Sequence, residues 1–125
     1  MIYSEENLGN RKIIFPSIDY RIDPEYKAKA SFNAMYEDGY FIECIDGIVI
    51  RGTVVVNGLR CMFPDFEIGE PASHFEGVKF ALYDNQIIIS EAACSALVDQ
   101  ACARYAQLQP ENSAKISDIL QARLL

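Results

Sequence analysis

The chain has 125 residues, half of them hydrophobic, and its 18 acidic and 11 basic side chains give a formal net charge of -7. This length fits one domain, residues 1–125, and the hydrophobic content supports a core and excludes wholesale disorder. The negative charge argues against nucleic acid or an anionic membrane as the main ligand, because both would repel the protein, and it favours cationic partners.

The chain shows no sign of export or of membrane insertion. Glu5 and Glu6 lie where a secretory signal needs a basic start followed by an apolar run. No stretch approaches the roughly 20 apolar residues that span a bilayer. We therefore expect a cytoplasmic protein.

The first third predicts an apolar segment and a helix. Residues 13–16, Ile-Ile-Phe-Pro, are typical of a short edge strand or an apolar anchor that ends at the proline. Asp23 precedes a proline and a glutamate, which favours a helix start. The helix is predicted over residues 24–37, and Gly39 can end it with a left-handed C-terminal cap.

The middle of the chain contains two dipeptides that favour hairpin turns. Asp46-Gly47 and Asn57-Gly58 separate runs rich in β-branched residues, and both central positions of such a turn need positive φ. The pattern predicts strands over residues 40–45, 48–56 and 59–63.

Alternation along these strands predicts a sheet with two different faces. The core face would hold Phe41, Ile45, Ile48, Ile50, Val54, Val56, Leu59, Cys61 and Phe63. The opposite, mixed face would hold Tyr40, Ile42, Cys44, Val49, Arg51, Thr53, Val55, Arg60 and Met62.

The last third predicts a second hairpin and two helices. Residues 78–83 and 86–89 flank a turn at Asp84-Asn85. Ser90 can cap a helix that runs to about residue 107 and carries one apolar stripe, and a last helix starts near Ser113. The predicted fold is α+β: an antiparallel β-meander of about five strands, with helices packed on one face.

The cysteines and the single histidine carry no strong chemical motif. Cys44, Cys61, Cys94 and Cys102 each lie in an apolar run, which favours buried free thiols over disulfides. They form no CxxC pair, and one histidine does not complete a zinc-ligand set. We expect no metal, no other cofactor and no catalytic residue.

Acidic side chains concentrate in one segment. Residues 39–85 hold seven acids and three bases, and no lysine or arginine occurs between Cys61 and Val78. An acidic patch with interleaved aromatics is complementary to a basic groove and speeds association by electrostatic steering. The predicted partner-binding residues are Asp65, Phe66, Glu67, Glu70, His74, Phe75 and Glu76.

A small, acidic, α+β chain with this acidic run and no catalytic motif resembles the immunity proteins of bacterial toxin/immunity pairs, including those of contact-dependent growth inhibition. The resemblance implies a stoichiometric inhibitor that docks on a cognate toxin and covers its active-site region. Many such toxins are basic nucleases. It further implies that the chain is not an enzyme.

Two other functions fit the same sequence, and the oligomeric state stays open. A ligand-binding or adaptor module would use the mixed sheet face around Tyr40, Ile42, Arg51 and Met62. A small hydrolase or transferase would use His74 with an acid or a thiol.

Overall fold

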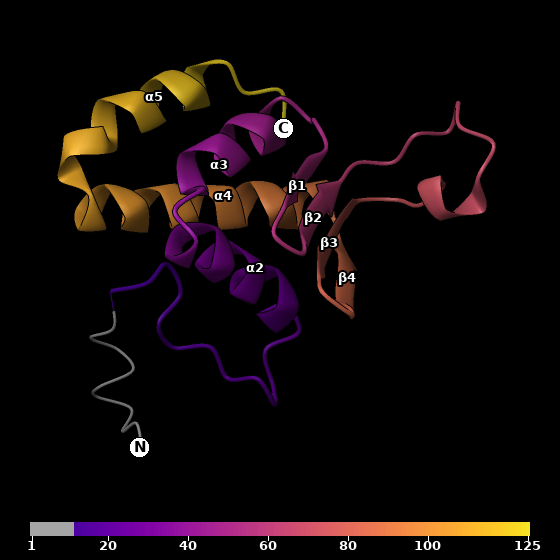
Figure 1. Cartoon of the computed structure of the whole chain (residues 1–125), viewed down its shortest axis with the longest axis horizontal. Helices are drawn as coiled ribbons and strands as arrows, with labels where there is room; N and C mark the ends of the chain where they lie inside the picture. The colour runs from indigo at the N-terminus through magenta and orange to yellow at the C-terminus, as the bar shows by residue number, and fades with distance from the viewer. Residues whose placement is uncertain (1–11) are drawn as a thin grey trace.

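The computed structural model describes residues 12–125, and within them it is α+β, as the sequence predicts (Figure 1). The helices are α2 (Tyr26–Glu37), α3 (Phe41–Val49), α4 (Glu91–Leu108) and α5 (Ser113–Gln121), with two short 3₁₀ helices, η1 (Pro71–Ser73) and η2 (Pro110–Asn112). The strands are β1 (Val54–Val56), β2 (Leu59–Met62), β3 (Val78–Leu82) and β4 (Asn85–Ile89). They form one four-stranded antiparallel sheet in the order β1-β2-β3-β4.

The first hairpin forms where the sequence predicts it. Val56 pairs with Leu59, so Asn57 and Gly58 are the two turn residues. Their φ angles are 46° and 79°, as the tight two-residue turn requires.

The second hairpin turns one residue earlier than predicted. Leu82 pairs with Asn85, so the turn is Tyr83-Asp84 and Tyr83 takes a φ of 54°. The neighbouring hairpin explains the shift, because the Tyr83 amide donates to the Gly58 carbonyl at 2.9 Å. The Tyr83 ring also covers Gly58, where an added Cβ would lie 2.6 Å from Cε1. The shift moves each cross-strand partner by two residues and leaves the predicted faces unchanged.

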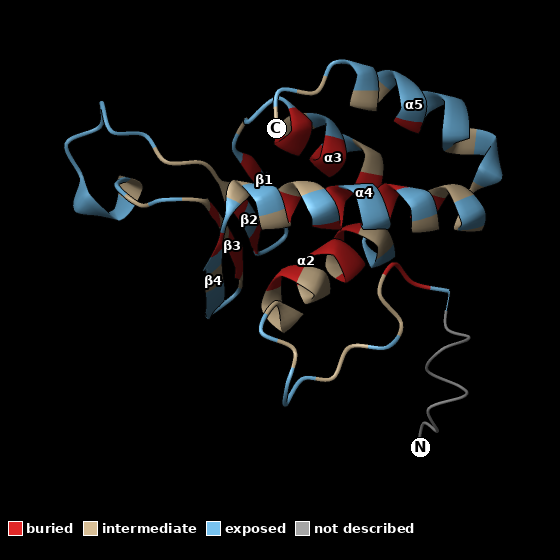
Figure 2. Cartoon of the chain, turned by 180° about the vertical axis from the view of Figure 1, so that it is seen from behind, coloured by how far each residue is buried: buried red, intermediate tan, exposed pale blue. Residues whose placement is uncertain are grey.

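One face of the sheet is covered by helices and the other is open (Figure 2). On the covered face, Phe80 of β3 meets Phe32 of α2, with ring centroids 5.5 Å apart. Val55, Arg60 and Ile88 are exposed on the other face. The buried side chains of the covered face are Val54, Leu59, Cys61, Val78, Phe80 and Ile89.

The segment before α2 is an apolar anchor and not a strand. Ile13 and Ile14 are buried, and Phe15 packs edge-on against Phe32 at 6.0 Å. The side chain of Asn33 on α2 holds the segment in place: it accepts from the Phe15 amide at 2.7 Å and donates to the Phe15 carbonyl at 3.1 Å.

Helix α2 ends as predicted but begins two residues later, and its N-cap residue is Glu25, which makes no side-chain capping bond, so Asp23 does not cap the helix. Asp23 accepts from the Glu25 amide at 2.8 Å and from Lys29 Nζ at 2.6 Å. The Lys29 hydrogen bond lowers the pKa of Asp23, although partial burial acts in the opposite direction. At the other end Gly39 has a φ of 81° and supplies the predicted left-handed cap.

Residues 41–49 form helix α3, so the strand predicted over residues 40–45 is wrong, and of the strand predicted over residues 48–56 only Val54–Val56 forms. Ile42 is half-buried, while the other five of the six apolar residues of this segment recur at helical spacing and are buried in the core: Phe41, Cys44, Ile45, Ile48 and Val49. A short apolar run is compatible with the period of a strand or of a helix. Here the helix is favoured because it buries one face against the other elements.

Glycine in the Asp46-Gly47 pair serves packing and not a turn. A Cβ on Gly47 would lie 2.7 Å from Cγ2 of Val54, so the glycine lets β1 approach α3. The helix ends at Val49, and Arg51, the residue after the C-cap Ile50, takes a φ of 61°. The Arg51 amide donates to the Ile48 carbonyl and the Gly52 amide to the Gly47 carbonyl, the two bonds of a Schellman cap.

Helix α4 and the C-terminal segment complete the core. Ser90 caps α4 by accepting from the Ala93 amide at 3.0 Å, as predicted. Arg123, which follows α5, donates to Asp99 Oδ1 at 2.5 Å and to the Ser95 carbonyl at 2.9 Å. Within residues 12–125, no helix combines the length and the apolar character needed to cross a bilayer.

Candidate functional site

The acidic segment predicted as the binding site forms a loop that projects from the rest of the protein. We call residues 63–77, which connect β2 to β3, the acidic loop. In Figure 1 it extends beyond the sheet, away from the helices, and in Figure 2 most of it is exposed. It contains the short helix η1.

Hydrogen bonds within the acidic loop give it a defined shape. The Asp65 amide donates to the Ser73 carbonyl at 2.9 Å, which joins the two sides of the loop. The Glu67 amide donates to Asp65 Oδ1 at 3.1 Å. The Nε2 atom of His74 lies 2.5 Å from the Ile68 carbonyl oxygen, so it carries the hydrogen of this bond. These contacts close the loop on itself.

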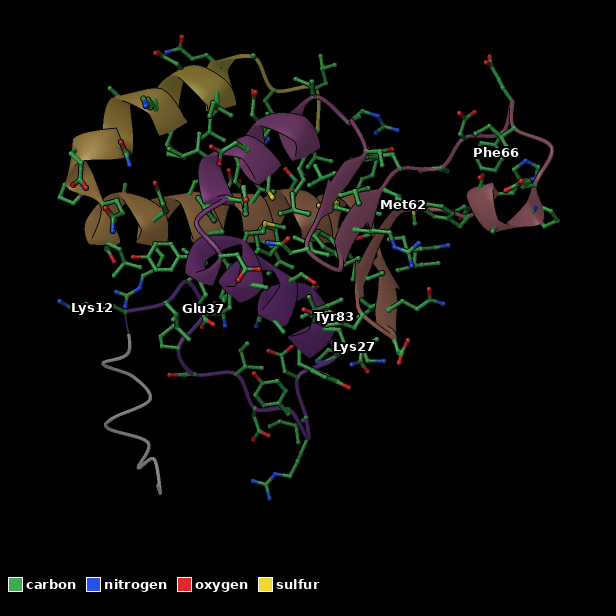
Figure 3. The ribbon with its side chains drawn as sticks, in the orientation of Figure 1. Lys12, Lys27, Glu37, Met62, Phe66 and Tyr83 are labelled. Carbon is green, nitrogen blue, oxygen red and sulfur yellow. The ribbon has the colours of Figure 1, made fainter. Side chains whose placement is uncertain are left out.

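Two aromatic residues of the predicted site play different parts. The Phe66 ring lies against the His74 ring, with centroids 5.5 Å apart, and Phe66 is 65% exposed (Figure 3). Phe75 is half-buried beneath Lys79, whose Nζ lies 4.6 Å from the ring centroid and also donates to the Ala72 carbonyl at 3.2 Å. Phe75 therefore attaches the loop to β3, whereas Phe66 is presented to solvent.

Glycine is required where the loop joins the sheet. Gly77 has a φ of 104°, and a Cβ there would lie 2.1 Å from the Ile89 carbonyl oxygen. By contrast, a Cβ on Gly69 within the loop would meet nothing within 4 Å. The base of the acidic loop is thus fixed tightly and its outer part has open space around it.

The exposed surface of the acidic loop combines negative charge with apolar groups. The four carboxylates are exposed: Asp65, Glu67, Glu70 and Glu76. Beside Phe66, Ile68 is 45% exposed. We did not predict Ile68 as a site residue, although an apolar side chain between two acids in a polar loop is a usable sign of an interface.

His74 does not form a Cys–His pair in the described part of the chain. All four cysteines are free and buried, whereas His74 is exposed in the loop and contacts Phe66 and Ile68. Burial raises the pKa of Cys44 to about 11 and that of Cys94 and Cys102 to about 12, and it raises the pKa of Cys61 further. The thiols are therefore protonated and unreactive at neutral pH.

The described residues contain no group of three or more potential metal-ligating side chains.

The mixed sheet face proposed as a ligand site does not exist as predicted. Tyr40 precedes α3, Ile42 lies on α3, and Arg51 follows that helix, where it pairs with Glu91. Of these four residues only Met62 lies on the sheet, because residues 40–53 do not form a strand.

The structure defines a class: a small α+β protein with an exposed acidic loop that closes on itself through hydrogen bonds. Comparison with known families refines it, since the model of the CDI immunity protein family matches residues 24–120. The chain therefore belongs to the CDI immunity protein family, whose members bind a cognate toxin. No curated protein matches the sequence.

Proposed function

We propose that the protein neutralises its toxin through the acidic loop, by covering the toxin's active-site region. The observation that carries the proposal is the exposure of Phe66 and Ile68 among four carboxylates on a loop whose two sides are joined by hydrogen bonds. A loop joined in this way loses little conformational freedom on binding, so less of the interaction energy is spent on ordering it.

The residues of the loop have separate roles in this proposal. Phe66 and Ile68 bury against the toxin, and the carboxylates of Asp65, Glu67, Glu70 and Glu76 pair with its basic side chains. His74 acts as a positioning residue, because its Nε2 atom holds the Ile68 carbonyl and its ring supports Phe66. Phe75 and Lys79 fix the base of the loop.

We further propose that the toxin is a basic nuclease. A nuclease holds phosphates with lysine and arginine side chains, and an acidic loop is complementary to such a groove. The net charge of -7 on this chain favours rapid encounter with a cationic surface. Nuclease assays of the toxin domain on RNA and DNA test this step, and a toxin with another activity would contradict it.

Charge reversal in the loop tests the docking surface. The partner is the cognate toxin domain, and association rates are measured by stopped flow at several salt concentrations. We expect Asp65→Lys combined with Glu67→Lys to slow association by about 10-fold or more and to flatten its salt dependence.

The matched control is Asp46→Lys combined with Asp118→Lys, which changes the net charge equally at exposed positions on α3 and α5. We expect the control to associate faster than the loop variant at every salt concentration. A second variant, Phe66→Ala, is expected to accelerate dissociation. Equal association rates for the two charge variants, or unchanged dissociation of Phe66→Ala, would remove the acidic loop from the interface.

A further inference from the structure

A second candidate binding site lies at the end of the molecule opposite the acidic loop. The C-terminal ends of α2 and α4, the start of α3 and the short helix η2 meet there (Figure 1). They enclose a pocket of about 440 Å³, which we call the helix-end pocket. This volume lies within the range of small-ligand sites, roughly 300–1,000 Å³.

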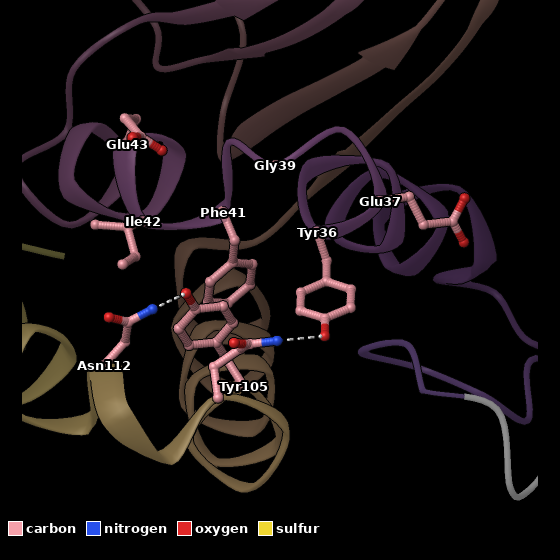
Figure 4. Close-up of a pocket in the computed structure, with 9 residues that line it drawn as sticks. Tyr36, Glu37, Gly39, Phe41, Ile42, Glu43, Tyr105 and Asn112 are labelled. Atoms are coloured by element: carbon pink, nitrogen blue, oxygen red, sulfur yellow. Dashed lines mark hydrogen bonds between the residues drawn. The ribbon is translucent and has the colours of Figure 1, made fainter.

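Aromatic rings form the wall of the helix-end pocket (Figure 4). Phe41 stacks on Tyr105 with centroids 4.4 Å apart and an interplanar angle of 15°. Tyr36 meets Tyr105 edge-on, with centroids 5.9 Å apart. Phe41 and Tyr105 are buried, while Tyr36 is half-buried and presents ring surface to the pocket. Aromatic rings attract both aliphatic groups and cations.

Two side-chain amides next to these rings have their nitrogens engaged. Gln109 Nε2 donates to the Tyr36 hydroxyl at 3.2 Å, and Asn112 Nδ2 donates to the Tyr105 hydroxyl at 3.0 Å. The carbonyl oxygen of each amide can accept hydrogen bonds from a ligand, and each nitrogen keeps a second hydrogen. The pocket can therefore accept hydrogen bonds from a ligand that donates them.

The charged side chains that line the helix-end pocket are both acidic. Glu37 and Glu43 line it, on either side of the aromatic rings in Figure 4, and none of its nine lining residues is basic. Helices α2 and α4 both end here without a basic residue in the last turn. The C-termini of α2 and α4 carry partial negative charge and the N-terminus of α3 carries partial positive charge, so the carboxylate of the exposed Glu43 is the negative charge on which the proposal depends.

We propose that the helix-end pocket binds a guanidinium or ammonium group carried on a short aliphatic stem. The stem packs on the Tyr36 ring, and the cation meets the Glu43 carboxylate and the amide oxygens. Such a group occurs in small amines and guanidines in solution and in basic side chains on a protein. In the second case the basic side chain belongs to the toxin, and this form of the proposal rests on the proposed immunity function.

The test uses agmatine as the probe and butylurea as a neutral analogue, with the full chain followed by NMR. We expect agmatine to give saturable shifts at residues 36–43 and 105–112, and butylurea to bind much more weakly. Glu43→Gln should weaken agmatine binding by about 10-fold, since it removes a hydrogen bond between charged groups. Asp118→Asn, which removes an exposed charge from α5, should leave it unchanged.

Three results would overturn the proposal: no saturable shift with agmatine, equal binding of butylurea, or equal binding by Glu43→Gln. Adding the toxin domain to the agmatine-saturated protein identifies the source of the cation. Displacement of agmatine indicates a toxin side chain in the pocket, and retention indicates a small ligand. The variant with Asp65→Lys and Glu67→Lys should still bind agmatine, so failure of the loop proposal and failure of this one are distinguishable.

Discussion

The acidic loop and the rest of the described protein, which we call the body, differ in whether their aromatic and aliphatic side chains are exposed or buried. In the body, aromatic and aliphatic groups such as Phe32 and Phe80 are fully buried and touch each other. In the loop, Phe66 and Ile68 are exposed, and the contacts that hold the loop are mostly its own. Most of the free energy of unfolding therefore comes from the body, and the exposed side chains of the loop can contact a partner with little loss of stability.

The largest expected effect comes from removing a ring from the body. Phe32→Ala should lower the free energy of unfolding by about 4 kcal/mol, because it loses buried contacts and leaves a cavity beside Phe80. Urea denaturation measures the change. Phe66→Ala, the same substitution in the acidic loop, should change stability by no more than about 0.5 kcal/mol. Similar losses for the two variants would contradict the division between body and loop.

The junction of loop and sheet should show the next largest effect. Gly77→Ala places a Cβ against the Ile89 carbonyl oxygen at an unfavourable φ, and we expect a loss of about 3 kcal/mol. Gly69→Ala is the control within the same loop, and its Cβ has open space. Thermal unfolding of both variants checks the prediction, which fails if Gly77→Ala is as stable as Gly69→Ala.

A charged pair of the body tests how electrostatics divide between the two regions. Lys29 lowers the pKa of Asp23 below its ordinary value of 3.8. The pair therefore stabilises the protein above that pH, and its contribution is lost as pH falls through 3.8 toward the lower folded-state pKa. Asp23→Asn should cost about 1 kcal/mol at pH 7 and nothing at strongly acidic pH.

Urea denaturation at pH 7 and at pH 3 measures this dependence. Glu70→Gln, at an exposed carboxylate of the acidic loop, is the control and should be nearly neutral at both pH values. If Asp23→Asn cost the same at the two pH values, the ionised pair would not be the source of its stability.

The smallest effect on stability is expected from the contact that shapes the loop. His74→Ala removes the hydrogen bond to the Ile68 carbonyl and the support for Phe66. Unfolding free energy should change by no more than about 0.5 kcal/mol, while amide hydrogen exchange at residues 65–74 should become faster. Glu70→Ala is the control for the exchange measurement. Unchanged exchange in His74→Ala would show that the histidine does not order the loop.

Local rules predicted the elements whose ends are set by residues adjacent in the chain. Asn57 and Gly58 make a two-residue turn because they tolerate positive φ, and Ser90 caps α4 because its oxygen reaches the third amide. The same reasoning went wrong at Asp46-Gly47, where the dipeptide fits a hairpin turn but the apolar spacing from Phe41 to Val49 fits a helix.

The acidic loop was predicted in composition and position but not in shape. Four acids and three phenylalanines between Cys61 and Val78 are visible in the sequence. That His74 holds the Ile68 carbonyl, and that Lys79 covers Phe75 while Phe66 stays exposed, depends on how the loop returns to the sheet. The helix-end pocket was missed for a related reason, since Tyr36, Phe41 and Tyr105 meet only after three helices pack.

The sequence by itself determined the α+β class, the caps at Ser90 and Gly39, the faces of the sheet strands and the place of the negative charge. Each follows from short-range geometry or from composition. The tertiary structure alone decided that residues 41–49 are helical and which aromatic rings are buried or exposed. These outcomes depend on contacts between segments that are distant in the chain. A conformation gains free energy from burial only when another surface covers its apolar side chains.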